Sequence, residues 1–323
     1  MKQIIDEDCK GAGLNRLCLN WLADAYLSHA VAVMTSTGNT DIKDQWLLLN
    51  IGDSHSKSTE LPVIAKTRFS RFAIAKSTGK HFFRPIIFPL EMKRHFYEPL
   101  VEYINLLNED RIILNNDKIC QWEEKKSALI WRGSFTGVNG DLDRTLLSTH
   151  IDGGPRIKVV RNYFHYNTSV IDVAFSDDSY GQYVRTSLSS MADQLKFKYL
   201  LSLEGNDVAT GLKWMLLSNS VVFMAKPQTV SFLMEDLLVP YVHFIPLEDD
   251  YSNIIEMVHW AQQNDEKCKW ISDQATLYME QLWTSQYAKR ENALIVQNLS
   301  MAYENQFGKA LESCAKKIEQ KMN

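Results

Sequence analysis

The sequence has no apolar run that approaches the roughly 20 residues needed for a membrane-spanning helix. Its first ten residues, MKQIIDEDCK, place acids where a secretory signal peptide would have its apolar core. Its five cysteines are odd in number, widely spaced and without a CxxC pair, which argues against a disulfide framework or a zinc site and favours buried reduced thiols. We therefore expect a cytoplasmic protein with no structural metal.

The familiar catalytic signatures are also missing. The sequence contains no P-loop, no serine hydrolase elbow, no HExxH and no GxGxxG, and its eight histidines show no ligand spacing. One acidic triplet, Asp141-Leu142-Asp143, has the D-x-D form with which some nucleotide-sugar enzymes hold a divalent metal. The triplet lies between a Gly-rich turn and a predicted helix start, where acids serve equally well as caps.

Composition and charge define the class of protein and suggest a partner. With 323 residues, 45% hydrophobic and 23% charged, the chain can build two ordinary globular domains. The net charge is −4, yet residues 61–94 carry eight basic side chains against one acid, Glu91, with phenylalanines interleaved. Such a stretch suits an anionic partner, which can be nucleic acid, a phosphorylated substrate or an anionic membrane surface. The alternative is a solvated basic face over core phenylalanines.

Apolar runs and helical periodicity predict alternating strands and helices. The predicted strands are 44–51, 61–65, 85–88, 128–131, 170–175, 198–203, 221–224 and 241–245. The predicted helices are 13–35, 90–108, 144–150, 210–220, 252–263, 265–286 and 294–322. This alternation indicates parallel sheets covered on both faces, whose ligands bind beyond the carboxyl ends of the strands. Asp53, Arg132 and Gly205 each follow a predicted strand and so fall where a site is expected.

The segment from Lys198 to Val222 is the clearest candidate for binding an anion. An apolar strand runs into a turn, 204–207, and then into a helix that carries Thr210 and Lys213 near its start. Unpaired N–H groups and the positive end of the helix dipole at such a junction suit a phosphate. Gly205 and Asn206 tolerate the backbone angles of the turn. An ordinary turn between a strand and a helix is the alternative.

Two further positions carry candidate chemistry. Asp53 follows an apolar strand through a glycine, and a partly desolvated carboxylate there suits a general base. It can equally cap a following turn. Arg132, Gly133 and Ser134 form a second phosphate-binding candidate, with Arg144 ten residues after Ser134. The alternative for these arginines is a structural ion pair, for example with Asp141 or Asp143.

Four stretches together resemble glycosyltransferase family 90, which includes protein O-glucosyltransferases, CAP10-like proteins and bacterial lipopolysaccharide glycosyltransferases. They are, in the order of the family, 49–54 (LNIGDS), 130–134 (IWRGS), 198–223 (KYLLSLEG and its helix) and 239–246 (VPYVHFIP). Because no signal peptide is recognised, the chain most resembles the bacterial lipopolysaccharide branch of this family.

The resemblance implies an α/β, GT-B-like fold with two Rossmann-like lobes facing a central cleft. The lobes would be residues 1–125 for the acceptor and 126–290 for the nucleotide sugar, with a helix at 291–323 crossing back to the first lobe. It also implies inverting, metal-independent transfer from a UDP-sugar without a cofactor. Asp53 would be the catalytic base, and Arg132, Gly133, Ser134, Arg144, Gly205, Asn206, Thr210 and Lys213 would form the donor site.

One departure from the family concerns the diphosphate. Eukaryotic members place an arginine in the segment from glycine to helix, where this chain has Gly211, so Lys213 and the backbone amides of 206–210 would supply the positive charge. The implied partners are UDP-glucose or UDP-galactose and an anionic lipopolysaccharide core, not nucleic acid. The basic stretch 61–94 would make peripheral contact with the cytoplasmic face of the inner membrane. A non-catalytic module that binds a nucleotide or an anionic glycan is the alternative function, and the lack of a paired-carboxylate motif disfavours a hydrolase.

Overall fold

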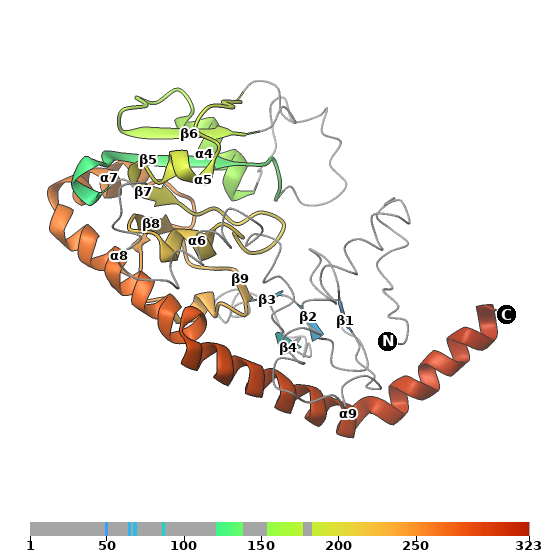
Figure 1. Cartoon of the computed structure of the whole chain (residues 1–323). Helices are drawn as coiled ribbons and strands as arrows, with labels where there is room; N and C mark the ends of the chain where they lie inside the picture. Colours follow the sequence, from blue (N-terminus) through green and yellow to red (C-terminus); the bar gives the residue numbers. More distant parts are fainter. Residues whose placement is uncertain are drawn as a thin grey trace.

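A computed structural model describes residues 121–137, 154–176 and 183–322, together with short strands at 49–50, 64–65, 67–69 and 86–87. A five-stranded parallel sheet dominates these residues (Figure 1). Its strands are β5 (Lys126–Gly133), β6 (Ile171–Phe175), β7 (Phe197–Leu201), β8 (Val221–Met224) and β10 (Ile245–Pro246). The α/β class and the parallel sheet predicted from the sequence are thus confirmed.

The order of the strands fixes where ligands can enter. Across the sheet it is β10-β8-β7-β5-β6, and every neighbouring pair is parallel. The first strand of the series, β5, therefore lies between the second, β6, and the third, β7, so that the winding reverses between β5 and β7. In doubly wound sheets the crevice forms at such a reversal, outside the carboxyl ends of the two strands.

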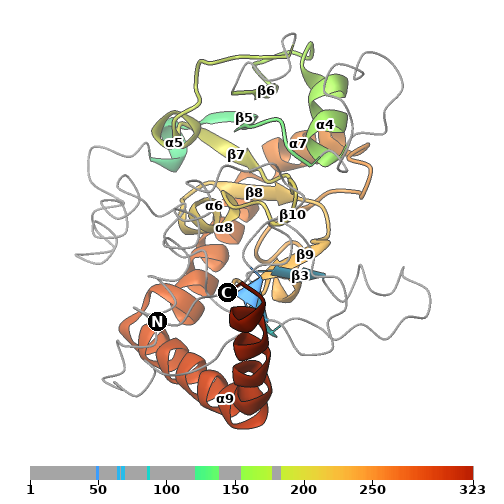
Figure 2. The ribbon, with the colours of Figure 1, turned by 90° about the vertical axis from the view of Figure 1, so that its right-hand side faces the viewer.

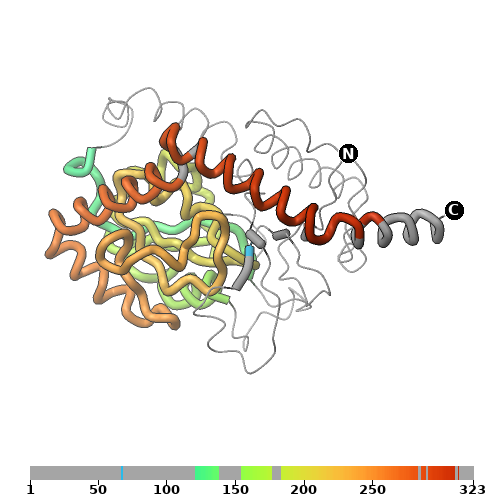
Figure 3. Tube along the Cα trace, turned by 90° about the horizontal axis from the view of Figure 1, so that it is seen from below, coloured from blue at the N-terminus to red at the C-terminus, as the bar shows by residue number. Residues whose placement is uncertain are grey.

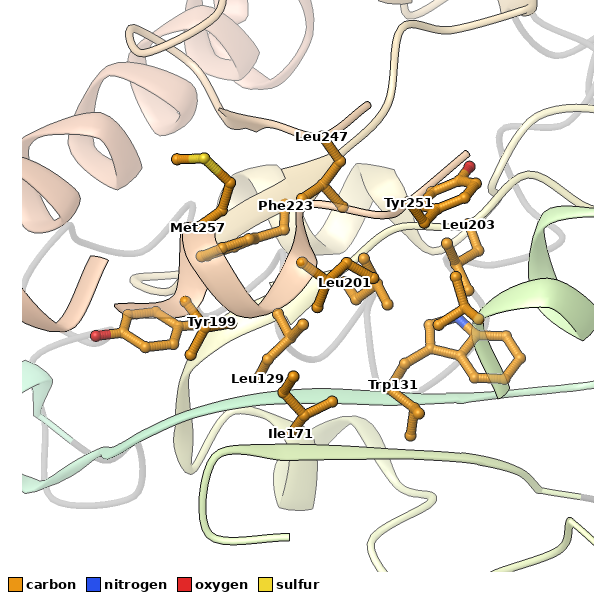
Figure 4. Close-up of a cluster of buried hydrophobic side chains, with 14 of the residues drawn as sticks. Leu129, Trp131, Ile171, Tyr199, Leu201, Leu203, Phe223, Leu247, Tyr251 and Met257 are labelled. Carbon is orange, nitrogen blue, oxygen red and sulfur yellow. The ribbon is translucent and has the colours of Figure 1, made fainter. Parts of the chain in front are cut away.

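Helices cover both faces of the sheet, because side chains that alternate along each strand are apolar in both directions. One face packs against α4 (Pro155–Tyr163), α7 (Ile254–Gln263) and the first half of α8 (Asp265–Met279). The other packs against α6 (Leu212–Leu217) and the second half of α8, near the short α5 (Met191–Gln194). Figure 4 shows the first of these clusters, with side chains from β5, β6, β7 and β8 meeting those of the α7 segment.

Four short strands come from the N-terminal part of the chain. The strands β1 (Leu49–Asn50), β2 (Ile64–Ala65) and β4 (Ile86–Ile87) form a second parallel sheet in the order β1-β2-β4. The strand β3 (Thr67–Phe69) pairs instead with β9 (Thr229–Ser231) in antiparallel register, with Arg68 opposite Val230. Figure 2 shows this pair between the large sheet and the small one. The basic stretch 61–94 thus contributes one strand that the sequence did not predict.

The C-terminal segment is helical except at Ser285, which is extended. After α8, a π-helical turn (Glu280–Thr284) leads into α9 (Gln286–Met322), which extends away from the large sheet (Figure 3). Two short 3₁₀ helices lie at Trp122–Glu124 and Glu235–Leu237. Among the described residues, no helix combines the length and the apolar character needed to cross a bilayer.

The predicted elements match the structure unevenly. The strands expected at 128–131, 170–175, 198–203 and 221–224 are confirmed, as are the helices at 252–263 and 265–286. The strand expected at 241–245 is wrong, because only Ile245 is in β10 and Tyr241 has a positive φ of 57° within a turn. The helix α4 was not predicted. The helices expected at 13–35, 90–108 and 144–150 lie outside the described residues.

Arg132 has a structural role that the sequence analysis weighed only as an alternative. The strand β5 continues past Trp131 to Gly133, so Arg132 is part of the strand. Its side chain lies next to Asp172 of the neighbouring strand β6. Its guanidinium donates to Asp172 Oδ1 at 2.9 Å and to three backbone carbonyls, those of Trp131, Asp172 and Ser187. Asp172 also binds Arg185 at 2.9 Å. Arg132 thus joins β5 to β6 through Asp172, while Asp141 and Asp143 lie outside the described residues.

Replacing Asp172 tests this buried pair. Asp172→Ala should lower the free energy of unfolding by about 3–5 kcal/mol, because it leaves a guanidinium that is 1% exposed without a counter-charge. Urea denaturation followed by circular dichroism measures the change. The matched control is Glu123→Ala, which removes the solvent-exposed ion pair with Lys269 and should have no measurable effect. Equal losses in the two variants would contradict the structural role of Arg132.

Candidate functional site

The candidate site lies at the carboxyl ends of β5 and β7, where the winding of the sheet reverses. The loop after β5 (residues 134–137) and the loop after β7 (residues 202–206) approach one another there, beside the start of α4. Asn206 Oδ1 accepts a hydrogen bond from the backbone N–H of Gly137 at 2.9 Å and thereby joins the two loops directly. Ser134, Gly205 and Asn206, all predicted as donor-site residues, meet at this edge.

Arg156, the second residue of α4, holds the two loops together. One terminal nitrogen, Nη1, donates to Ser134 O at 3.1 Å, Ser134 Oγ at 3.3 Å and Thr136 Oγ1 at 2.6 Å. The other side of the guanidinium donates to Leu203 O from Nε and Nη2, both at 3.3 Å. A planar fork with five N–H groups can serve acceptors on both loops at once, which a lysine cannot do.

Two glycines permit this close approach. Gly137 has a φ of 86°, a conformation that side chains disfavour. A Cβ on Gly205 would lie 2.7 Å from Thr136 Oγ1 and 3.0 Å from the Arg156 guanidinium carbon. Gly205 is therefore required for packing between the loops, and not only for the turn in which it was predicted.

A cavity of about 210 Å³ opens beside these loops. Its walls come from the residues after β7, from the loop after β8, from α6 and from Pro155 at the start of α4. The apolar lining residues include Val208, Leu212, Met224, Ala225 and Pro227, and the acidic ones are Glu204, Glu235 and Asp249. Lys226, exposed at the rim, is the one lysine or arginine among the described residues that line it.

Glu204 is an acid of the cavity wall whose pKa is shifted. Its Oε1 accepts hydrogen bonds from the backbone N–H groups of Gln228 and Thr229, both at 3.0 Å, and so fixes the loop after β8. Burial raises the pKa of Glu204 to about 7, and nearby Glu235 and Asp207 add to the shift. At neutral pH this carboxyl group is therefore divided between its two protonation states.

Lys213 lies away from the cavity lining. Its side chain is 2% exposed, with the ammonium 4.8 Å from the centre of the Phe232 ring. Its charge lowers the pKa of buried Glu235, although burial raises that pKa overall. Both oxygens of Glu235 accept hydrogen bonds from Ser231, one from its N–H and one from its hydroxyl. The described geometry thus gives Lys213 a partner inside the fold and shows no opening from it to a ligand.

The other predicted residues fall in different places. Gly133 ends β5 alongside the Trp131 indole, and Ser134 is exposed beside Arg156. Thr210 is partly buried in the turn before α6. Asp53 and Arg144 lie outside the described residues, as does the Asp141-Leu142-Asp143 triplet. Among the residues that the structure describes, no cluster of three histidine, cysteine or acidic side chains could hold a metal ion.

Sequence reasoning missed Arg156 and the roles of Glu204 and Lys226. A signal for Arg156 existed, because Gly153-Gly154-Pro155 has the form of a helix start with proline at the first position. Glu204 directly follows a predicted apolar strand. The same position after a strand led to the prediction that Asp53 is a general base, so this reasoning could also have identified Glu204. The position of Lys226 had no signal, because it depends on a cavity formed by segments far apart in the sequence.

Comparison with known proteins gives a consistent picture. Residues 103–290, more than half of the chain, match the family model described as "Glycosyl transferase family 90". The chain is 29% identical over 235 residues to the O-glucosyltransferase LpsA of Dichelobacter nodosus, covering 73% of this chain and 59% of that protein. It is 26% identical over 205 residues to protein O-glucosyltransferase 1 of Rattus norvegicus, covering 57% of this chain and 47% of that protein. The chain thus spans about half to three-fifths of the length of these relatives.

Arg156→Lys tests the connection between the loops. The variant should lower the free energy of unfolding by about 1–3 kcal/mol, because a single ammonium replaces a guanidinium that serves both loops. Amide exchange should become faster at residues 134–137 and 203–206, as hydrogen–deuterium exchange would show. The matched control is Lys158→Ala, which removes an exposed cation from the same helix and should leave both loops unchanged. Unchanged exchange in Arg156→Lys would contradict the connection.

Glu204→Gln tests the raised pKa. A carboxyl group whose pKa rises on folding contributes most stability below its unfolded value, near 4.5, and loses that contribution as the pH passes about 7. The amide stays neutral, so the stability of the variant relative to the natural protein should increase between pH 5 and pH 8. Urea denaturation at several pH values measures this difference, with exposed Glu248→Gln as the control. Parallel pH curves for Glu204→Gln and the natural protein would refute the shift.

Proposed function

This chain belongs to glycosyl transferase family 90, and we propose from that membership that it transfers glucose from UDP-glucose to a lipopolysaccharide core. The observation that carries the proposal is the cavity at the carboxyl edge of the doubly wound sheet, within the matched residues. Two of the similar proteins are named O-glucosyltransferases, which favours glucose over galactose as the sugar.

The donor nucleotide would bind where the winding reverses between β5 and β7. The cavity extends from Pro155, next to Arg156, to Tyr251 and Glu235, so one end of it lies near the loops after β5 and β7. Cations are favourable near a leaving diphosphate, because charge develops there in the transition state. Lys226 at the rim and Arg156 between the loops are the described cations at this edge. Ser134 and Gly205, which the family resemblance implies as donor-site residues, lie beside Arg156.

The acceptor would bind on the N-terminal side. The parallel sheet β1-β2-β4 supports a second lobe, as a GT-B arrangement requires, and β3 brings residues 67–69 next to the cavity-lining Thr229. An anionic core oligosaccharide suits the basic stretch 61–94, which would also hold the enzyme at the cytoplasmic face of the inner membrane.

The reaction would invert the anomeric centre without a metal. Asp53, three residues after β1, would take the proton of the acceptor hydroxyl as that oxygen attacks the anomeric carbon. The bond from that carbon to the β-phosphate oxygen breaks, and UDP leaves with the electron pair. No cofactor takes part in these steps.

A transfer assay tests the proposal. The purified chain, with EDTA present, should transfer glucose from UDP-glucose to truncated lipopolysaccharide cores, and more slowly or not at all from UDP-galactose or GDP-mannose. Asp53→Asn should lower turnover by about 10²–10⁴-fold while thermal stabilisation by UDP persists. The control is Glu266→Gln, an exposed acid on α8. Stabilisation by UDP without transfer to any acceptor would favour the non-catalytic binding module, and near-normal turnover of Asp53→Asn would place the base elsewhere.

A further inference from the structure

One oxygen of Glu204 is committed to the fold and the other is open to a ligand. Oε1 accepts both backbone hydrogen bonds, from Gln228 and Thr229, so the carboxyl group cannot turn without breaking them. Within the described part of the chain, Oε2 accepts no hydrogen bond, although Glu204 lines the cavity. A carboxylate oxygen at the wall of a cavity can accept hydrogen bonds from a ligand that brings donors.

The size of the cavity limits what can enter. Pockets for whole drug-sized ligands usually measure about 300–1,000 Å³. At about 210 Å³, this cavity takes one ring-sized part of a nucleotide sugar and leaves the remainder outside. The apolar residues of its wall, among them Val208, Leu212 and Met224, suit the carbon face of such a ring.

The charge of the cavity selects among those parts. Glu204, Glu235 and Asp249 all line it, and the one cation among the described lining residues, Lys226, lies at the rim, so the interior offers a phosphate no counter-charge. A uracil ring offers one N–H donor and two carbonyl oxygens, which would face carboxyl groups. Vicinal hydroxyls on a sugar ring offer two O–H donors side by side and can both reach one carboxylate oxygen, which has two lone pairs.

We propose that this cavity binds the ribose of the donor nucleotide and that Glu204 Oε2 accepts hydrogen bonds from its 2′- and 3′-hydroxyls. The inference rests on the proposed function, which supplies a nucleotide-sugar donor. The ribose joins the base to the diphosphate, so a ribose in the cavity leaves the phosphates at the rim, where Lys226 lies. The glucose of the donor carries the same vicinal-diol chemistry, and the experiment separates the two sources.

Calorimetric titration with UDP and 2′-deoxy-UDP tests the proposal in the full chain. At pH 8, above the raised pKa of Glu204, the natural protein should bind UDP about 10–100-fold more tightly than 2′-deoxy-UDP, the range expected for a hydrogen bond to a charged group. In Glu204→Gln, binding of UDP should weaken by about tenfold or more, and the preference for UDP should shrink to a few-fold. That loss of preference distinguishes direct contact with the ribose from a role of Glu204 in holding the 226–229 loop, which would weaken both ligands equally. Glu248→Gln should behave as the natural protein does.

Each other outcome overturns a defined claim. Equal affinity of the natural protein for UDP and 2′-deoxy-UDP, or a preference that persists in Glu204→Gln, would refute the ribose site. An effect of Glu204→Gln on UDP-glucose but not on UDP would assign the diol to the glucose and refute the ribose. The absence of binding of any UDP compound would defeat the proposed function itself, and the ribose site with it.

Discussion

The guanidinium of Arg156 joins the loops after β5 and β7, and the geometry of the candidate site depends on that connection. A parallel sheet whose winding reverses leaves the connections on either side of the reversal diverging, and this divergence opens a crevice. The crevice has a defined shape only if the loops at its edge are fixed. Here a single side chain, aided by Asn206 and by glycines at 137 and 205, fixes both.

The charged side chains of the described residues divide the site into an acidic interior and a basic margin. Acids line the interior of the cavity, where Glu204 fixes the loop after β8 and Glu235 is held by Ser231. The basic groups lie at its margin, with Lys226 on the rim and Arg156 between the loops. A ligand that is neutral and rich in hydroxyls at one end and anionic next to it fits this division, and a nucleotide sugar has that character.

The sequence predicted the large sheet well, because strands buried on both faces appear as uninterrupted apolar runs such as Val221–Met224. It failed at 241–245, where Val239 N–H donates to His243 Nδ1 and closes a turn that hydrophobicity does not reveal. Arg132 was expected to bind phosphate because it followed the predicted strand, which ended two residues before the end of β5. The true strand includes Arg132, and its partner Asp172 is 40 residues away. Arg156 was not predicted, because its role depends on contacts between α4, the loop after β5 and the loop after β7.

The β3–β9 pair has a mechanical consequence for the cavity. Thr229, whose N–H is held by Glu204, is both a wall residue and the register partner of Phe69. Main-chain hydrogen bonds of a strand pair resist sliding far better than side-chain packing does, so a displacement of 67–69 must either break the pair or pull on that wall. The geometry of the cavity is thereby linked to the position of a strand from the N-terminal part of the sequence. A shift of residues 67–69 can therefore change the shape of the cavity while the same residues still line it.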